Sequence, residues 1–158
     1  MYIQLLYMKD ITEILKTKTN LPLAKKTVLN VSFASNHFKD GILSVLKPYD
    51  ISIEQFNVLR ILRGKNGEPS NLKDIQDRMI SKMSNTTRLV DKLILKNLVE
   101  RFTCEKNRRK VDIYITDGGL KLLELVDPII EEKENELTNN LSKEELETLN
   151  LLITKMRG

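Results

Sequence analysis

The chain has 158 residues, enough for one domain with a core of its own, and 41% of them are hydrophobic while only 5% are aromatic. Its single cysteine excludes an internal disulfide and favours a reducing, cytoplasmic location, and no apolar run is long enough to cross a membrane. The net charge of +4 is unevenly spread along the chain. Residues 78–110 contain ten Lys/Arg and three Asp/Glu, whereas residues 117–158 contain five Lys/Arg and ten Asp/Glu. This difference indicates a polyanionic partner for the middle of the chain.

The N-terminal part predicts an extension followed by a long helix. We expect residues 1–22 to be a partly disordered extension, of which residues 1–7 are either native or a start-site addition. Apolar residues at steps of three and four then predict a helix over residues 23–46, which ends before Pro48.

Two helices with clear start signals come next. Ser52 and Gln55 have the spacing of a capping box, and the helix they open continues through Leu62 to a stretch rich in glycine and proline. Asn71, with Asp74 three residues later, is expected to cap a shorter third helix.

A fourth helix follows the polar stretch over residues 81–87. Its buried stripe is predicted to comprise Leu89, Val90, Leu93 and Ile94. Asn97 is expected to end it, because asparagine adopts the left-handed backbone conformation more readily than most residues other than glycine.

Two short strands, 98–103 and 111–116, are predicted to pair as a hairpin. The second strand alternates apolar and polar residues from Val111 to Ile115. The connecting loop is strongly basic, since four of the five residues over 106–110 are Lys or Arg.

Two helices complete the predicted fold. Thr116 can cap a long helix from Asp117 to about residue 139, in which Pro128 should kink the helix or loosen one turn. A capping box at residues 142–145 opens the last helix. The fold class is therefore mainly α with a small β-hairpin (α+β).

The third and fourth helices have the layout of a helix-turn-helix. A recognition helix must present hydrogen-bonding side chains to the DNA bases while its other face holds a core. Clusters of Ser, Asn and Thr are also ordinary helix caps, so the pattern alone leaves both interpretations open. The predicted DNA-binding residues of the fourth helix are Lys82, Ser84, Asn85, Thr86, Thr87, Arg88 and Lys92.

The basic hairpin favours the DNA interpretation. A charged loop between strands, directly after a helix-turn-helix, is typical of a wing that reaches the minor groove, where the planar cation of arginine fits well. The alternative is an exposed turn kept soluble by its charges. The predicted wing residues are Lys106, Asn107, Arg108, Arg109 and Lys110.

The span from Ser52 to Leu123 resembles the winged-helix domain of the MarR family of transcriptional regulators. The matching stretches are "SIEQFNVLRIL", "TTRLVDKLILKNLVER" and "NRRKVDIYITDGG". The family's wing signature is Asp-x-Arg, then Leu-Thr and a glycine; here the corresponding residues are Asn107, Arg109, Ile115-Thr116 and Gly119. The resemblance implies a winged helix-turn-helix over residues 48–116.

The resemblance also implies an assembly and residue roles. Helices over residues 23–47 and 117–158 would dimerise, and a twofold dimer would bind a pseudo-palindromic operator in double-stranded DNA, most simply as a repressor. Arg109 would enter the minor groove, with Arg108 and Lys110 on phosphates. Asp91 would pair with a nearby arginine such as Arg101.

Regulation in this family usually comes from a small ligand or from cysteine oxidation. A small aromatic or anionic effector could release the DNA, and His37 and Phe38 are the candidate pocket residues, although a lone histidine on a helix is more often a surface or packing residue. Cys104 is either redox-active or, more simply, an unreactive strand cysteine. The operator, the target genes and the effector's identity are not encoded in any motif.

Two other classes of function are weaker. An enzyme is disfavoured, because one histidine and one cysteine far apart form no evident catalytic pair, and no phosphate-binding loop, metal motif or cofactor motif occurs. A winged helix that binds proteins but not DNA is the main alternative. It would present an apolar or acidic face on the fourth helix.

Overall fold

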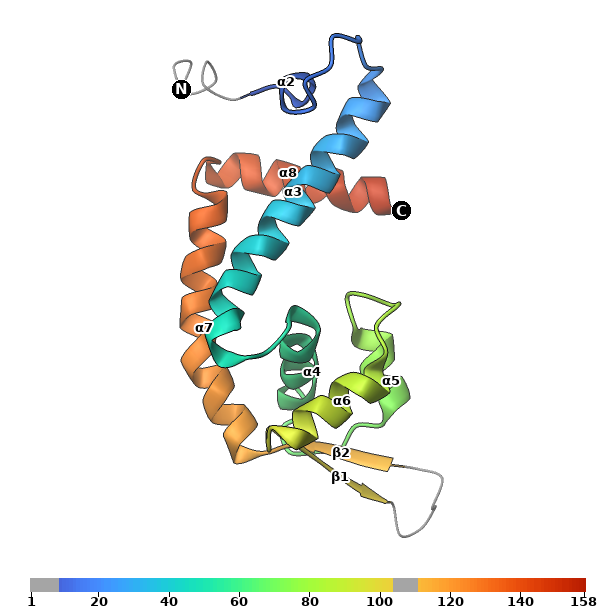
Figure 1. Cartoon of the computed structure of the whole chain (residues 1–158), viewed down its shortest axis with the longest axis vertical. Helices are drawn as coiled ribbons and strands as arrows, with labels where there is room; N and C mark the ends of the chain where they lie inside the picture. The colour runs from blue at the N-terminus through green and yellow to red at the C-terminus, as the bar shows by residue number, and fades with distance from the viewer. Residues whose placement is uncertain (1–8, 104–110) are drawn as a thin grey trace. The chain divides into compact units, whose positions relative to one another are not determined.

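The computed structural model describes residues 9–103 and 111–158, and its contacts divide the chain into two compact units. The first unit extends to Asp40 and the second runs from Gly41 to Gly158, so that the boundary falls within helix α3 (Leu23–Leu46). Figure 1 shows the course of the chain. The predicted dimerisation segments, 23–47 and 117–158, stay predictions.

The first unit contains a short helix that the sequence analysis did not assign. Helix α2 (Ile11–Ile14) is capped by Asp10, whose carboxylate accepts a hydrogen bond of 2.9 Å from the backbone N–H of Thr12. Lys26 of α3 lies 3.7 Å from the same carboxylate. The extension predicted over residues 1–22 is therefore partly helical in its described portion, and residues 1–8 lie outside it.

The second unit has the predicted order of helices and one hairpin. After the last turns of α3 its elements are η1 (Lys47–Tyr49), α4 (Ile53–Arg63), α5 (Leu72–Arg78), α6 (Thr86–Leu95), β1 (Val99–Thr103), β2 (Val111–Ile115), α7 (Asp117–Thr138) and α8 (Lys143–Arg157). The fold class predicted from sequence is confirmed. In the described residues no helix is long and apolar enough to span a membrane.

The helix starts follow the predicted caps. The side chains of Ser52, Asn71, Thr116 and Ser142 each accept a backbone N–H three residues on, and the first and last belong to complete capping boxes. Helix α7 continues as one α-helix through Pro128, so the predicted loosening of a turn is not observed. Buried Val126 and Ile130 on either side hold the helix where one backbone hydrogen bond is missing.

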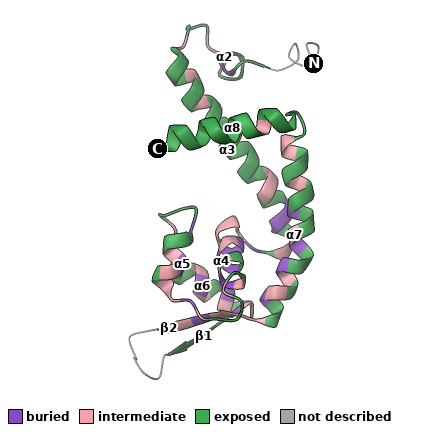
Figure 2. Cartoon of the chain, turned by 180° about the vertical axis from the view of Figure 1, so that it is seen from behind, coloured by how far each residue is buried: buried purple, intermediate pink, exposed green. Residues whose placement is uncertain are grey.

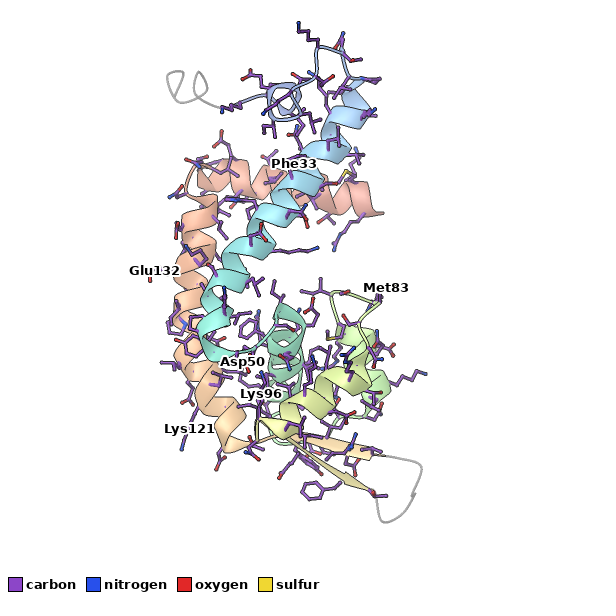
Figure 3. All side chains as sticks on the ribbon, viewed as in Figure 1. Phe33, Asp50, Met83, Lys96, Lys121 and Glu132 are labelled. Carbon is purple, nitrogen blue, oxygen red and sulfur yellow. The ribbon has the colours of Figure 1, made fainter. Side chains whose placement is uncertain are left out.

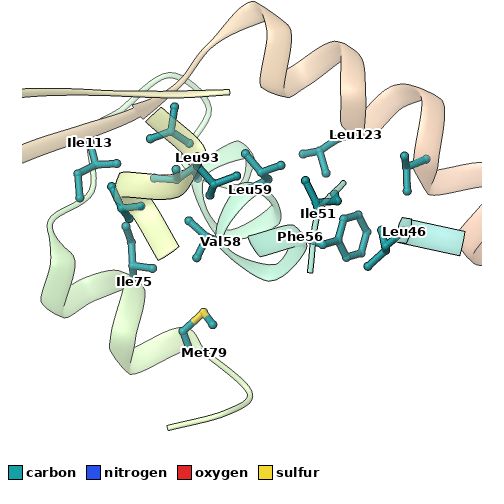
Figure 4. Packing of buried hydrophobic residues seen from close by; sticks show 14 of the residues in the cluster. Leu46, Ile51, Phe56, Val58, Leu59, Ile75, Met79, Leu93, Ile113 and Leu123 are labelled. Atoms are coloured by element: carbon teal, nitrogen blue, oxygen red, sulfur yellow. The ribbon is translucent and has the colours of Figure 1, made fainter. Parts of the chain in front are cut away.

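The core joins the helix-turn-helix, the hairpin and the first half of α7. Figure 4 shows Leu59 of α4 and Leu93 of α6 at its centre, both fully buried. Ile75 and Met79 of the α5 region and Ile113 of β2 complete one side. Figure 2 shows that the buried residues gather in these elements, whereas α8 has no buried residue.

The hairpin is antiparallel and has an additional bridge that sequence reasoning missed. Val99 pairs with Ile115 and Thr103 with Val111. Ser70, just before α5, forms two backbone hydrogen bonds of 2.9 and 3.0 Å with Ile113. The bridge fixes the start of the helix-turn-helix against the second strand of the hairpin.

A tight junction joins the end of α6 to the start of α7. Asn97 has the predicted left-handed conformation, with φ of 57°, and its carbonyl accepts a 2.8 Å hydrogen bond from the hydroxyl of Thr116. Gly119 packs so closely that a Cβ atom there would clash with the carbonyl oxygen of Leu98 and lie 2.7 Å from Ile115. The hairpin and α7 are thereby held in one arrangement.

Candidate nucleic-acid interface

The turn between α5 and α6 is fixed by the side chain of Gln76. Its amide group donates a 2.7 Å hydrogen bond to the carbonyl of Lys82, and its carbonyl accepts a hydrogen bond from the hydroxyl of Thr86. The ammonium of Lys82 donates to the carbonyl of Asp77 at 2.5 Å. These contacts across the turn set the angle at which α6 leaves it.

Helix α6 has one buried face and one exposed polar face. Thr86, Val90 and Leu93 are buried. The exposed side carries Arg88 and Lys92, one turn apart. Such a helix can present cations and hydrogen-bond donors outward without losing its core contacts, as a recognition helix must.

Four of the predicted DNA-binding residues surround one surface groove of about 410 Å³. They are Ser84, Asn85, Arg88 and Lys92. The side-chain oxygen of Asn85 caps α6 by accepting the backbone N–H of Arg88 at 3.0 Å, which leaves its amide nitrogen as the group available to a ligand. Met83, 95% exposed, lies at the tip of the preceding turn and also lines the groove (Figure 3).

Thr86 requires a correction. It was predicted to contact DNA, but it is only 6% exposed and its hydroxyl is bonded to Gln76. The assignment is wrong because the residue is at the position of α6 that faces α5. Thr87 is exposed, and Lys82 is exposed with its ammonium turned back to the Asp77 carbonyl.

The first strand of the hairpin is linked to α6 by an ion pair. The guanidinium of Arg101 in β1 lies 2.7 Å from a carboxylate oxygen of Asp91, which confirms the pairing expected between these residues. The exposed face of the hairpin carries Phe102 and Tyr114, whose ring centroids are 5.9 Å apart. The predicted wing residues Lys106–Lys110, and Cys104, lie outside the described residues.

His37 and Phe38, the predicted pocket residues, lie on α3 in the first unit. Their ring centroids are 6.2 Å apart and both side chains are exposed. Exposure is more typical of surface residues than of an enclosing pocket, and their role stays a prediction.

A second groove, of about 670 Å³, lies on another side of α6. It is lined by the ends of α3 and α6, by η1 and by the start of α4. Lys96, just after α6, reaches Asp50, with its ammonium 2.8 Å from the carboxylate and also bonded to the Asp50 carbonyl (Figure 3). This contact lowers the pKa of the Asp50 carboxyl, with a smaller contribution from the charge of Lys92. No sequence motif marked this groove.

Sequence reasoning also missed Gln76 and Glu54. Gln76 is one of several polar residues on α5, and nothing in its spacing indicates that it bonds across the turn. Glu54, in the first turn of α4, lines the groove of Arg88 and Lys92. Among the described residues, no three His, Cys, Asp or Glu side chains gather as metal ligands would.

Comparison with known proteins agrees with this geometry. The model of the MarR family matches residues 51–111. The chain is 32% identical over 124 residues to the multiple antibiotic resistance protein MarR of Escherichia coli, a match that covers 77% of this chain and 84% of the relative. It is 29% identical over 122 residues to the transcriptional regulator MhqR of Bacillus subtilis, covering 77% and 83%.

Solved structures give the same result. A crystal structure of a MarR mutant from Escherichia coli complexed with operator DNA has a TM-score of 0.74 and 25% identity, and the match covers 94% of this chain and 99% of that one. A putative MarR-like regulator from Bacillus cereus, at 22% identity, shares the fold with a TM-score of 0.76, covering 85% and 95%. The chain belongs to the MarR family of winged-helix transcriptional regulators.

Proposed function

We propose that this chain is a transcriptional repressor that binds a pseudo-palindromic operator as a homodimer. The observation that carries the proposal is the exposed polar face of α6, whose Arg88 and Lys92 stand opposite buried Val90 and Leu93. A similar chain, MarR from Escherichia coli, has been crystallised with operator DNA. In this chain α6 would lie in the major groove.

Two further features support the same proposal. The Arg101–Asp91 ion pair joins the hairpin to α6, so the basic loop that the sequence places at the hairpin's tip would reach the groove next to the one occupied by α6. Helix α8 exposes an apolar stripe that a second copy can cover. A twofold dimer would present two α6 helices about one DNA turn apart.

The test is selection of bound duplexes from a random pool, followed by binding measurements at several salt concentrations. We expect an inverted repeat, and a slope of log affinity against log salt of about −0.9 for each phosphate neutralised. Failure to enrich any sequence, together with a slope near zero, would contradict the proposal.

Arg88→Ala is the first variant to measure. We expect it to weaken operator binding by about 1–3 kcal/mol and to relax the preference at one base pair of each half-site. Lys121→Gln, which removes an exposed charge from α7, is the matched control and should bind as the parent does. Arg109→Ala, in the predicted wing, should weaken binding and reduce the preference for A·T-rich flanks.

A winged helix that binds proteins remains the second candidate, because three large apolar side chains near the helix-turn-helix are exposed. They are Ile80 at 82%, Met83 at 95% and Leu95 at 83%. A protein-binding module would show no enriched duplex and a weak dependence on salt. The same experiment therefore separates the two functions.

A further inference from the structure

Met83 is an apolar side chain that the chain holds on a fixed backbone and leaves in solvent (Figure 3). It lies in the turn between α5 and α6, where the backbone N–H of Ser84 donates a 3.2 Å hydrogen bond to the carbonyl of Ser81. The side-chain amide of Gln76 donates to the carbonyl of Lys82, the residue before Met83, at 2.7 Å. The backbone is therefore bonded on both sides of Met83, although the side chain is 95% exposed.

The surroundings of Met83 distinguish it from an ordinary exposed residue. A single exposed apolar side chain is common on protein surfaces and by itself indicates nothing. Met83, however, lines the same groove as four predicted DNA-binding residues, Ser84, Asn85, Arg88 and Lys92. A duplex that binds these residues therefore also meets the methionine, whose unbranched thioether packs well on irregular apolar groups.

The other lining residues favour a nucleic-acid base over a protein as the group that covers Met83. Lys92 and Glu54 both line the groove, and both residue types are depleted from protein–protein interfaces. Arg88 and Lys92 outnumber the single carboxylate, as binding to a polyanion requires.

Asn85 narrows the choice of base. Its side-chain oxygen is used by the cap of α6, so its amide group offers only hydrogen-bond donors to a ligand. Asn85 and Met83 line the groove two residues apart, and together they offer a donor and an apolar group. Thymine presents the complementary pair in the major groove, an O4 acceptor and a methyl group.

We propose that Met83 is a specificity-determining residue that packs on the 5-methyl group of one thymine in each half-site of the operator. Thymine is the only one of the four DNA bases that presents a methyl group in the major groove, so an apolar contact there discriminates against the other three. The inference rests on the proposed function. It adds an apolar contact to the polar and charged residues predicted from the sequence to bind DNA.

The test replaces single thymines of the selected operator by uracil and measures the affinity of the full chain. Uracil keeps the O4 acceptor and lacks only the methyl group, so a difference in affinity reports on the apolar contact. We expect one thymine in each half-site at which the replacement lowers the parent's affinity about fourfold, the factor that burial of one methyl group is worth. Replacement in both half-sites should lower it about tenfold or more, because the two subunits contribute alike.

Variants of Met83 assign the effect to its side chain. Met83→Ala should bind the thymine and uracil operators with equal affinity, whereas Met83→Leu, which keeps an apolar side chain of similar volume, should still prefer thymine by about twofold or more. Ile80→Ala is the matched control. Ile80 is 82% exposed in the same connection between α5 and α6, but it is not among the described residues that line the groove. Its removal should leave the parent's preference unchanged, and circular dichroism should show all three variants folded.

The outcomes separate this inference from the proposed function. If the chain enriches an inverted repeat but no thymine of that operator is sensitive to uracil, the inference is overturned and the operator function stands. The same holds if Met83→Ala keeps the parent's sensitivity, or if Ile80→Ala loses it as well. If no duplex is enriched, both the inference and the proposed function are overturned.

Discussion

Helices α6 and α8 are both short and amphipathic, yet they bury their apolar residues very differently. Val90 and Leu93 of α6 are fully buried against α4, α5 and β1. Helix α8 has no buried residue in the described structure, and Leu152 is 57% exposed. Both helices have good caps, so the difference lies in packing partners and not in helix formation.

The apolar stripes of α6 and α8 require different packing partners. The stripe of α6 is completed by residues of its own chain, so its burial needs no second copy. The stripe of α8, formed by Leu149, Leu152, Ile153 and Met156, would leave several large side chains in water, and contiguous exposed apolar surface usually marks an interface. A second copy is the partner that the proposed function supplies.

The largest effect should come from a charge in the α8 stripe. Leu152→Glu places a carboxylate on that face in both subunits of a twofold dimer, and losing two buried leucines alone removes about 3–6 kcal/mol of dimerisation free energy. Sedimentation at micromolar concentration should show a shift from dimer to monomer. Leu151→Glu is the matched control, because Leu151 is 68% exposed and lies on the opposite side of the helix. Equal effects of the two substitutions would show that the stripe is not the interface.

The complementary change tests the packing of α6. Leu93→Ala creates a cavity at the centre of the core and should lower the free energy of unfolding by about 2–5 kcal/mol. Leu95→Ala, two residues later and 83% exposed, should change it by less than about 0.5 kcal/mol. Denaturant unfolding at several protein concentrations measures both. Similar losses in the two variants would contradict the division of α6 into a buried and an exposed face.

Contacts between residues close in the sequence could be predicted, because their spacing alone indicates them. Caps at Ser52, Asn71, Thr116 and Ser142 were predictable because each is a hydrogen bond between residues three apart. The Arg101–Asp91 pair followed from the resemblance, which set the hairpin beside α6.

Contacts between distant residues were not predictable in this way. Two such contacts are the hydrogen bond from Thr86 to Gln76 and the bridge between Ser70 and Ile113. Both depend on how the elements pack, and no spacing of nearby residues predicts them. Thr86 is of a residue type that often contacts DNA, but it occupies a buried position in the core. The second groove, lined by the ends of α3 and α6, by η1 and by the start of α4, combines residues from four elements, so it can be recognised only in the folded chain.

The next prediction concerns the tight junction between the end of α6 and the start of α7. Gly119→Ala introduces a methyl group against the Leu98 carbonyl and Ile115, and should destabilise the fold by about 1–3 kcal/mol despite the better helix propensity of alanine. Gly64→Ala is the control, since its nearest neighbours would be 3.5 Å away and its φ is −65°. It should be neutral or stabilise by up to about 1 kcal/mol. Thermal unfolding distinguishes them, and a stable Gly119→Ala protein would show that the junction can relax.

The smallest expected effect concerns the ion pair that joins α6 to the hairpin. Arg101 and Asp91 have side chains 40% and 48% exposed, so water and salt screen their attraction. A double-mutant cycle with Arg101→Gln and Asp91→Asn should give a coupling of about 0.2–1 kcal/mol that decreases at high salt. Operator binding is the more sensitive readout, because an unbraced hairpin leaves the wing less well placed. We expect Arg101→Gln to change the free energy of operator binding by more than it changes the free energy of unfolding, and Lys121→Gln to change neither. That result would show that the pair positions the hairpin and does not hold the core.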